Sequence, residues 1–148
     1  MRIILISITV LLLLNLDATC QVKIITGKVI DEYFDAVPYA QIQNSDSVSL
    51  AATDINGQFS ISVPIETKSL LIVSISCEPT TVHLTDSCNQ IDLIIMRFAS
   101  YDYISLKKVD KLRMKRFKRL PKLHLAAYKK GIFKTSAACY TQDFISFN

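Results

Sequence analysis

Only a few residues of this 148-residue chain have types and spacings that suit metal binding or catalysis. Asp54, Asn56 and Gly57 open one such group, in the stretch Asp-Ile-Asn-Gly-Gln. A calcium loop of this kind needs further oxygen ligands at alternate positions and a closing glutamate, and residues 58–63 do not continue that pattern. Asn-Gly instead tolerates the positive φ angles of a tight turn, so we predict the bend of a β-hairpin here.

The two histidines, His83 and His124, do not lie in a zinc-binding or catalytic pattern. Neither begins a His-x-x-Glu pair, and a catalytic zinc ion needs three protein ligands. Cys139 has no base close to it in the sequence, since His124 lies 15 residues earlier. We interpret both histidines as solvent-facing residues, and we predict no catalytic activity, no metal site and no cofactor.

The first twenty residues have the layout of a secretory signal peptide. Arg2 supplies a positive start, an apolar run of twelve residues follows, and Ala18 is the small residue near its exit. The apolar run is short for a membrane span. We predict a signal peptide at residues 1–20, cleavage between Cys20 and Gln21, and export to the periplasm, the outer membrane or the medium.

The alternative is a lipoprotein anchored to a membrane through Cys20. In that case Cys20 becomes the acylated first residue of the mature chain. Asp17 stands where such signals usually have leucine, and Thr19 stands where they usually have glycine or alanine. These two departures favour simple cleavage.

Three cysteines remain after the predicted cleavage, namely Cys77, Cys88 and Cys139. Pairing is favoured in an exported chain, and an odd count leaves one thiol unpaired. A bridge between Cys77 and Cys88 would close a short loop around the segment Thr-Thr-Val-His-Leu. In the other arrangement, Cys77 is a buried small apolar residue and Cys88 is an exposed free thiol.

The net charge of +4 hides two parts of opposite sign. Residues 21–96 carry three lysines and nine acidic residues, a net charge of −6, whereas residues 97–148 carry thirteen basic and three acidic residues, a net charge of +10. We place a boundary near Arg97, between a first domain at residues 21–97 and a basic extension at residues 98–148.

The first part has the alternation of β-strands throughout. Seven short apolar or β-branched segments are separated by turn-forming residues. They are VKIITGKVID, VPYAQIQ, SVSLAAT, FSISV, SLLIVSIS, TTVHL and IDLIIM. We predict a mainly β fold, a seven-stranded antiparallel sandwich in which each sheet buries alternate residues against the other.

Several residues of this part occur in an order and spacing typical of one family. They are Gly27, Val29, Asp31, Pro38, Ala40, Asp54, Gly57 and Phe59. Over residues 23–96 the chain resembles the carboxypeptidase regulatory-like domain, a transthyretin-like, immunoglobulin-like β-sandwich. The resemblance implies a domain of the kind found at the N-terminus of TonB-dependent receptors and other envelope proteins. Ser76-Cys77 departs from it, because the family usually has glycine and an aromatic residue there.

The basic extension is predicted to be partly helical. Ser105 can cap a helix that Pro121 ends, and a second, weaker helix runs over residues 123–130 to Gly131. An apolar stripe on the first helix is predicted to dock on the sandwich or on a neighbour. It consists of Leu106, Val109, Leu112, Phe117 and Leu120. The opposite side carries the candidate contacts for an anionic partner, Lys107, Lys108, Lys111, Lys115, Lys118 and Arg119.

These observations favour a non-catalytic exported module that binds another envelope component, a protein or a glycan, through the sandwich and the basic extension. One alternative is a basic surface that binds anionic glycolipid, membrane or, with least support, nucleic acid. The other alternative is an accessory subunit of an envelope peptidase or transporter, which would copurify with the catalytic partner.

Overall fold

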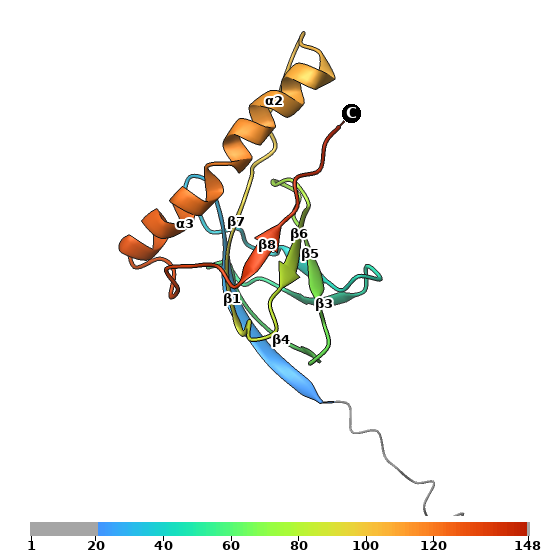
Figure 1. The fold of residues 1–148 in the computed structure, drawn as a ribbon, viewed down its shortest axis with the longest axis vertical. Helices are drawn as coiled ribbons and strands as arrows, with labels where there is room; N and C mark the ends of the chain where they lie inside the picture. The colour runs from blue at the N-terminus through green and yellow to red at the C-terminus, as the bar shows by residue number, and fades with distance from the viewer. Residues whose placement is uncertain (1–20, 148) are drawn as a thin grey trace, which may run out of the picture.

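The computed structural model of the protein describes residues 21–147, which form eight strands and two helices (Figure 1). The predicted signal peptide and the acylation of Cys20 fall on residues 1–20, outside the described residues. The strands are β1 (Val22–Asp31), β2 (Gln41–Gln43), β3 (Ser49–Ala52), β4 (Gln58–Pro64), β5 (Ser69–Val73), β6 (Thr80–Leu84), β7 (Gln90–Ile95) and β8 (Tyr140–Gln142). The helices are α2 (Leu106–Phe117) and α3 (Leu120–Lys129).

The strands form two sheets, and the predicted mainly β fold is confirmed. One sheet has the order β4-β1-β7, and the other has the order β3-β2-β5-β6-β8. Each of the seven predicted segments overlaps one of the strands β1 to β7. Buried side chains from both sheets meet in one apolar cluster, to which Ile25, Ile72 and Leu93 contribute from β1, β5 and β7.

The prediction of an entirely antiparallel arrangement of seven strands is wrong in two respects. β1 pairs with β7 in parallel, with Val29 opposite Leu93, and an eighth strand, β8, comes from the basic extension. Alternation shows which side chains are buried but does not give the direction of the neighbouring strand. The apolar run at residues 93–95 of β7 reflects burial on both faces, since Leu93 lies in the core and Ile94 packs towards the helices.

The turn at Asp54 and Gly57 is tight, as predicted, but it does not form a hairpin within one sheet. The Asp54 carboxylate accepts hydrogen bonds from the backbone of Asn56 and Gln58 at 2.9 and 2.7 Å, and Gly57 has φ +75°. β3, before the turn, and β4, after it, belong to different sheets. The Gly57 carbonyl accepts from Val29 N of β1, so the turn passes the chain from one sheet to the other.

Helices α2 and α3 follow one another along one side of the sheets (Figure 1). Ser105 is the N-cap residue of α2, as predicted, although its hydroxyl makes no capping hydrogen bond. Pro121 does not end α2, which stops four residues earlier, but lies in the first turn of α3, where its missing N–H costs no helical hydrogen bond. Gly131 follows the end of α3 with φ +71°, as the predicted second helix required.

The predicted apolar stripe of α2 is only partly buried. Val109 and Leu120 are buried and Phe117 is half-buried, but Leu106 and Leu112 remain 56% and 41% exposed. The residues that α2 itself buries are Val109, Asp110 and Arg113. This helix is therefore attached mainly through buried charge, which hydrophobic patterning does not reveal.

Candidate functional site

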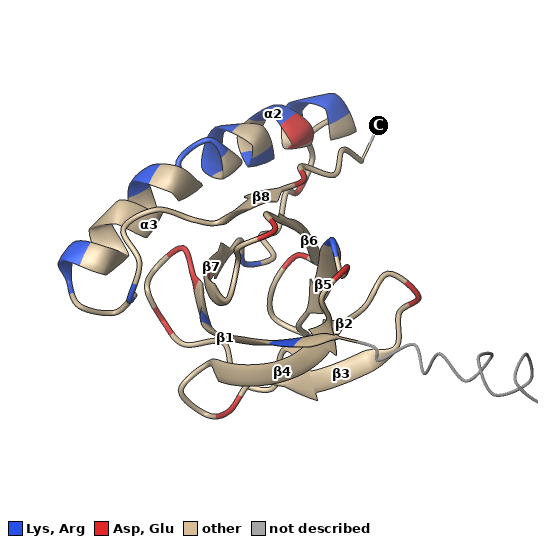
Figure 2. Cartoon of the chain, turned by 60° about the horizontal axis from the view of Figure 1, so that its bottom comes forward, with Lys and Arg blue, Asp and Glu red and all other residues tan. Residues whose placement is uncertain are grey.

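The six predicted basic residues of the extension are all exposed. We call them the basic face: Lys107, Lys108, Lys111, Lys115, Lys118 and Arg119. Figure 2 shows the basic residues spread along both helices. Within residues 21–147, no salt bridge joins the basic face to an acidic side chain. The charges of this face are therefore available to an anionic partner.

Arg113 points in the opposite direction and attaches α2 to the strands. Its guanidinium meets both carboxylate oxygens of Glu78, the shortest contact being 2.7 Å from Nη2 to Oε2. A further contact, of 3.0 Å, joins Nη1 to Asp110 Oδ1, and the centroid of the Phe147 ring lies 3.7 Å from the guanidinium carbon. The side chains of Arg113 and Glu78 are 4% and 7% exposed, so this ion pair is buried.

Arg116 provides a second attachment point one turn later. Its guanidinium pairs with Glu32, donates to the Tyr101 hydroxyl at 3.0 Å and donates to the Arg97 carbonyl at 2.7 Å. The hydrogen bond to Glu32 raises the pKa of Arg116 above its usual value, so the charge is permanent. Two arginines in a very basic helix thus neutralise acidic residues of the strand region, and the lysines of the basic face do not.

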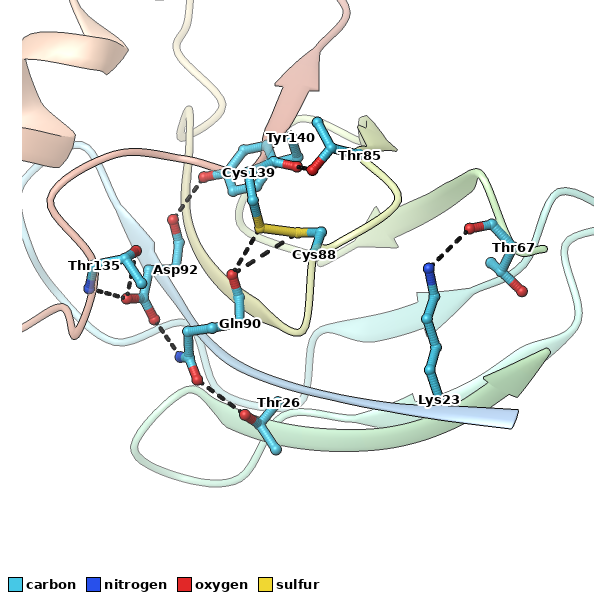
Figure 3. Close-up of a disulfide and its surroundings, with 10 residues drawn as sticks. All are labelled: Lys23, Thr26, Thr67, Thr85, Cys88, Gln90, Asp92, Thr135, Cys139 and Tyr140. Carbon is cyan, nitrogen blue, oxygen red and sulfur yellow. Dashed lines mark hydrogen bonds between the residues drawn. A yellow bond between two sulfur atoms is a disulfide. The ribbon is translucent and has the colours of Figure 1, made fainter. Parts of the chain in front are cut away.

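The segment between α3 and β8 is held by Asp92 of β7 (Figure 3). The backbone N–H groups of Lys134 and Thr135 donate to Asp92 Oδ2 at 2.7 and 3.0 Å, and the Thr135 hydroxyl donates to the same oxygen. The Tyr140 hydroxyl donates to the Asp92 carbonyl at 2.6 Å. Asp92 is 1% exposed, and these bonds account for its burial.

A disulfide joins Cys88 to Cys139, next to this cluster (Figure 3). The bridge considered between Cys77 and Cys88 is wrong, because Cys77 is a free, buried thiol. Cys77 precedes β6 and Cys88 follows it, so the strand holds the two cysteines at opposite ends. Cys88 is also buried, which corrects the alternative of an exposed free thiol there. The alternative of Cys77 as a buried small residue agrees with the structure.

The thiol count tests this arrangement directly. In unreduced protein that begins at Gln21, we expect Ellman's reagent to find no fast-reacting thiol in the native state and one thiol after denaturation. Burial raises the pKa of Cys77, so little thiolate is present at neutral pH. Three thiols in denaturant would show that the Cys88–Cys139 disulfide does not form.

The two histidines have different environments. His83 on β6 is exposed, as predicted, and its Nε2 lies 2.6 Å from the carboxylate of Asp143. His124 is 6% exposed, which corrects the solvent-facing interpretation. Its Nε2 lies 3.1 Å from the Thr135 carbonyl, and its ring packs on Phe133. The helical period of α3 turns His124 towards the sheet, a signal that was present in the sequence.

Neither a metal centre nor a membrane-spanning helix occurs in the described part of the chain. No cluster of three His, Cys, Asp or Glu side chains in residues 21–147 is arranged to hold a metal ion. No helix within those residues is both long enough and apolar enough to cross a bilayer.

Comparison with known proteins does not assign the chain to a family. A scan of the sequence against protein-family models gives no match, and a search of curated proteins gives none either. The basic face and its attachment to the strands must therefore be interpreted from their own side chains.

Proposed function

We propose that the protein is a non-catalytic exported module that binds an anionic component of the cell envelope through its basic face. The supporting observation is that the basic residues of this helical region have two different roles. Arg113 and Arg116 hold the helix against the strand region, while the six side chains of the basic face stay exposed and outside any salt bridge among residues 21–147. A helix held in this way presents its cations as one fixed array.

The proposal includes a carboxypeptidase regulatory-like sandwich at residues 21–97. Two glycines of the resemblance occupy positions that need glycine. A Cβ on Gly27 would lie 2.0 Å from the Ile91 carbonyl oxygen, and one on Gly57 would lie 2.3 Å from the Val29 carbonyl oxygen. The buried cluster shared by the two sheets is also what a sandwich requires.

Export is supported by the Cys88–Cys139 disulfide. Disulfides persist in the periplasm and outside the cell, and they are rare in a reducing cytosol. The signal peptide proposed for residues 1–20 agrees with that compartment.

Charge reversal on the basic face tests the proposed function. We expect K108E/K111E/K115E to weaken binding to heparin, a soluble polyanion, roughly tenfold or more at low ionic strength, and to flatten the salt dependence. The matched control is K129E/K130E/K134E, which makes the same change in net charge at exposed positions near the end of α3. Equal losses in the two variants would indicate a general charge effect and would contradict the proposed site.

A further inference from the structure

A groove of about 690 Å³ lies beside the basic face, where α2 gives way to α3. The helices contribute Phe117, Pro121 and Leu125 to its lining, and the opposite side includes Ile94 and Ala138. Figure 2 shows β8 lying between the helices and β6, at this part of the molecule. Small-molecule sites in proteins commonly have volumes of about 300–1,000 Å³ and mostly apolar walls, and this groove has both properties.

Three of the polar side chains in the lining are already engaged within the protein. His124 Nε2 contacts the Thr135 carbonyl at 3.1 Å, and the Gln142 amide donates to the Ile94 carbonyl at 2.9 Å. The Tyr140 hydroxyl is used by the Asp92 carbonyl. A bound peptide would need partners for most of its own N–H and C=O groups, and only the side chains of Lys118, Ser136 and Thr141 remain in the lining to supply them. An aliphatic chain needs none.

Positive charge borders the groove on the side of the helices. Lys118 belongs both to the groove lining and to the basic face, and Arg119 and Lys122 are its exposed neighbours in sequence. Salt bridges within residues 21–147 do not include these three cations. An apolar groove with an unneutralised lysine in its lining is complementary to an amphiphile that has an aliphatic chain and an anionic headgroup.

We infer that the groove binds the acyl chain of an anionic amphiphile, with its carboxylate or phosphate held by Lys118 and the neighbouring cations. This inference rests on the proposed function and makes it more specific, because it assigns a chemical class to the anionic envelope component. A free fatty acid and an acidic membrane lipid share this chemistry.

Calorimetric titration with octanoate, decanoate and dodecanoate below their micelle concentrations tests the groove. We expect the affinity to rise about fourfold for each added methylene, because each buried methylene contributes a similar transfer free energy. Decanol, which has the chain without the charge, should bind more weakly than decanoate at low salt. Dioctanoyl phosphatidylglycerol as a second probe distinguishes a membrane lipid from a free fatty acid.

Two matched pairs of variants locate the binding. L125D places a charge in the groove, and L106D makes the same change at a partly exposed leucine of α2 outside the groove lining. K118E reverses the cation at the groove, and K129E reverses an exposed lysine at the end of α3, outside both the groove lining and the basic face. We expect L125D to weaken dodecanoate binding at least tenfold and K118E to weaken it several-fold. L106D and K129E should change it little.

The outcomes separate this inference from the proposed function. An affinity that does not depend on chain length, or equal effects of L125D and L106D, would overturn the acyl site even if heparin binding persists. Two other results would replace the acyl chain with another occupant of the groove. One is binding of an acidic apolar peptide by a protein that does not bind dodecanoate, and the other is a dimer that L125D dissociates. Dodecanoate binding without heparin binding would keep the groove and remove the extended basic face.

Discussion

Replacing Arg113 by methionine is expected to lower the free energy of unfolding by about 3–5 kcal/mol, because it leaves the buried carboxylate of Glu78 without its main counter-charge. The nearest remaining cation, Arg116 Nη1, lies 3.8 Å from Glu78 Oε1. Because α2 depends on this pair for its attachment, residues 107–119 should become accessible to trypsin. Urea unfolding and limited trypsin digestion measure the two effects.

The wild-type protein should resist trypsin throughout residues 107–119, despite the many lysines and arginines there. Rapid cleavage of the native wild type, leaving a stable core that ends near Arg97, would contradict the docked helix. It would instead indicate a cationic tail that folds on meeting its partner.

Two further variants identify buried charge as the cause. R113M/E78M should recover part of the loss, since apolar residues of similar volume often replace a buried ion pair without penalty. The exposed pair of Lys68 and Asp86 is the surface control, and K68M should leave the unfolding midpoint nearly unchanged. If R113M behaved like K68M, the attachment of α2 would not depend on the ion pair.

Removing the disulfide should have an effect of similar size. C88S/C139S opens a cross-link with a sequence separation of 51, for which the chain-entropy relation gives about 4 kcal/mol. The segment between α3 and β8 should loosen first, because the disulfide and Asp92 hold it together. Urea unfolding of the oxidised protein and of this variant measures the loss, and trypsin cleavage after Lys134 reports the local opening.

The control for this variant is C77A, which removes a buried sulfur but no cross-link. We expect it to cost about 1 kcal/mol, the effect of a small cavity in the core. A C88S/C139S variant no less stable than C77A would show that the disulfide contributes little to folding.

The sequence by itself determined the local elements. Strict alternation in residues such as Phe59, Ile61 and Val63 predicts a half-buried strand, and the structure has strand β4 at these residues with alternate side chains buried. Asn56 and Gly57 predict a tight turn, because glycine adopts positive φ without strain. The period of the basic extension predicts its helices and the exposed side that carries the basic face. All of these follow from backbone preferences and from the need to bury apolar side chains.

The tertiary structure decided the partners of those elements. Glu78 and Arg113 are 35 residues apart, Cys88 and Cys139 are 51 apart, and each has several chemically equivalent alternatives in the sequence. β7 pairs in parallel with β1, and in this position it contacts both α3 and β8. Contacts between distant segments decide which arginine is buried, which cysteines form the disulfide and where the groove lies. The reason is that the free energies of burial and of pairing depend on the neighbours of a side chain in three dimensions and not on the local sequence.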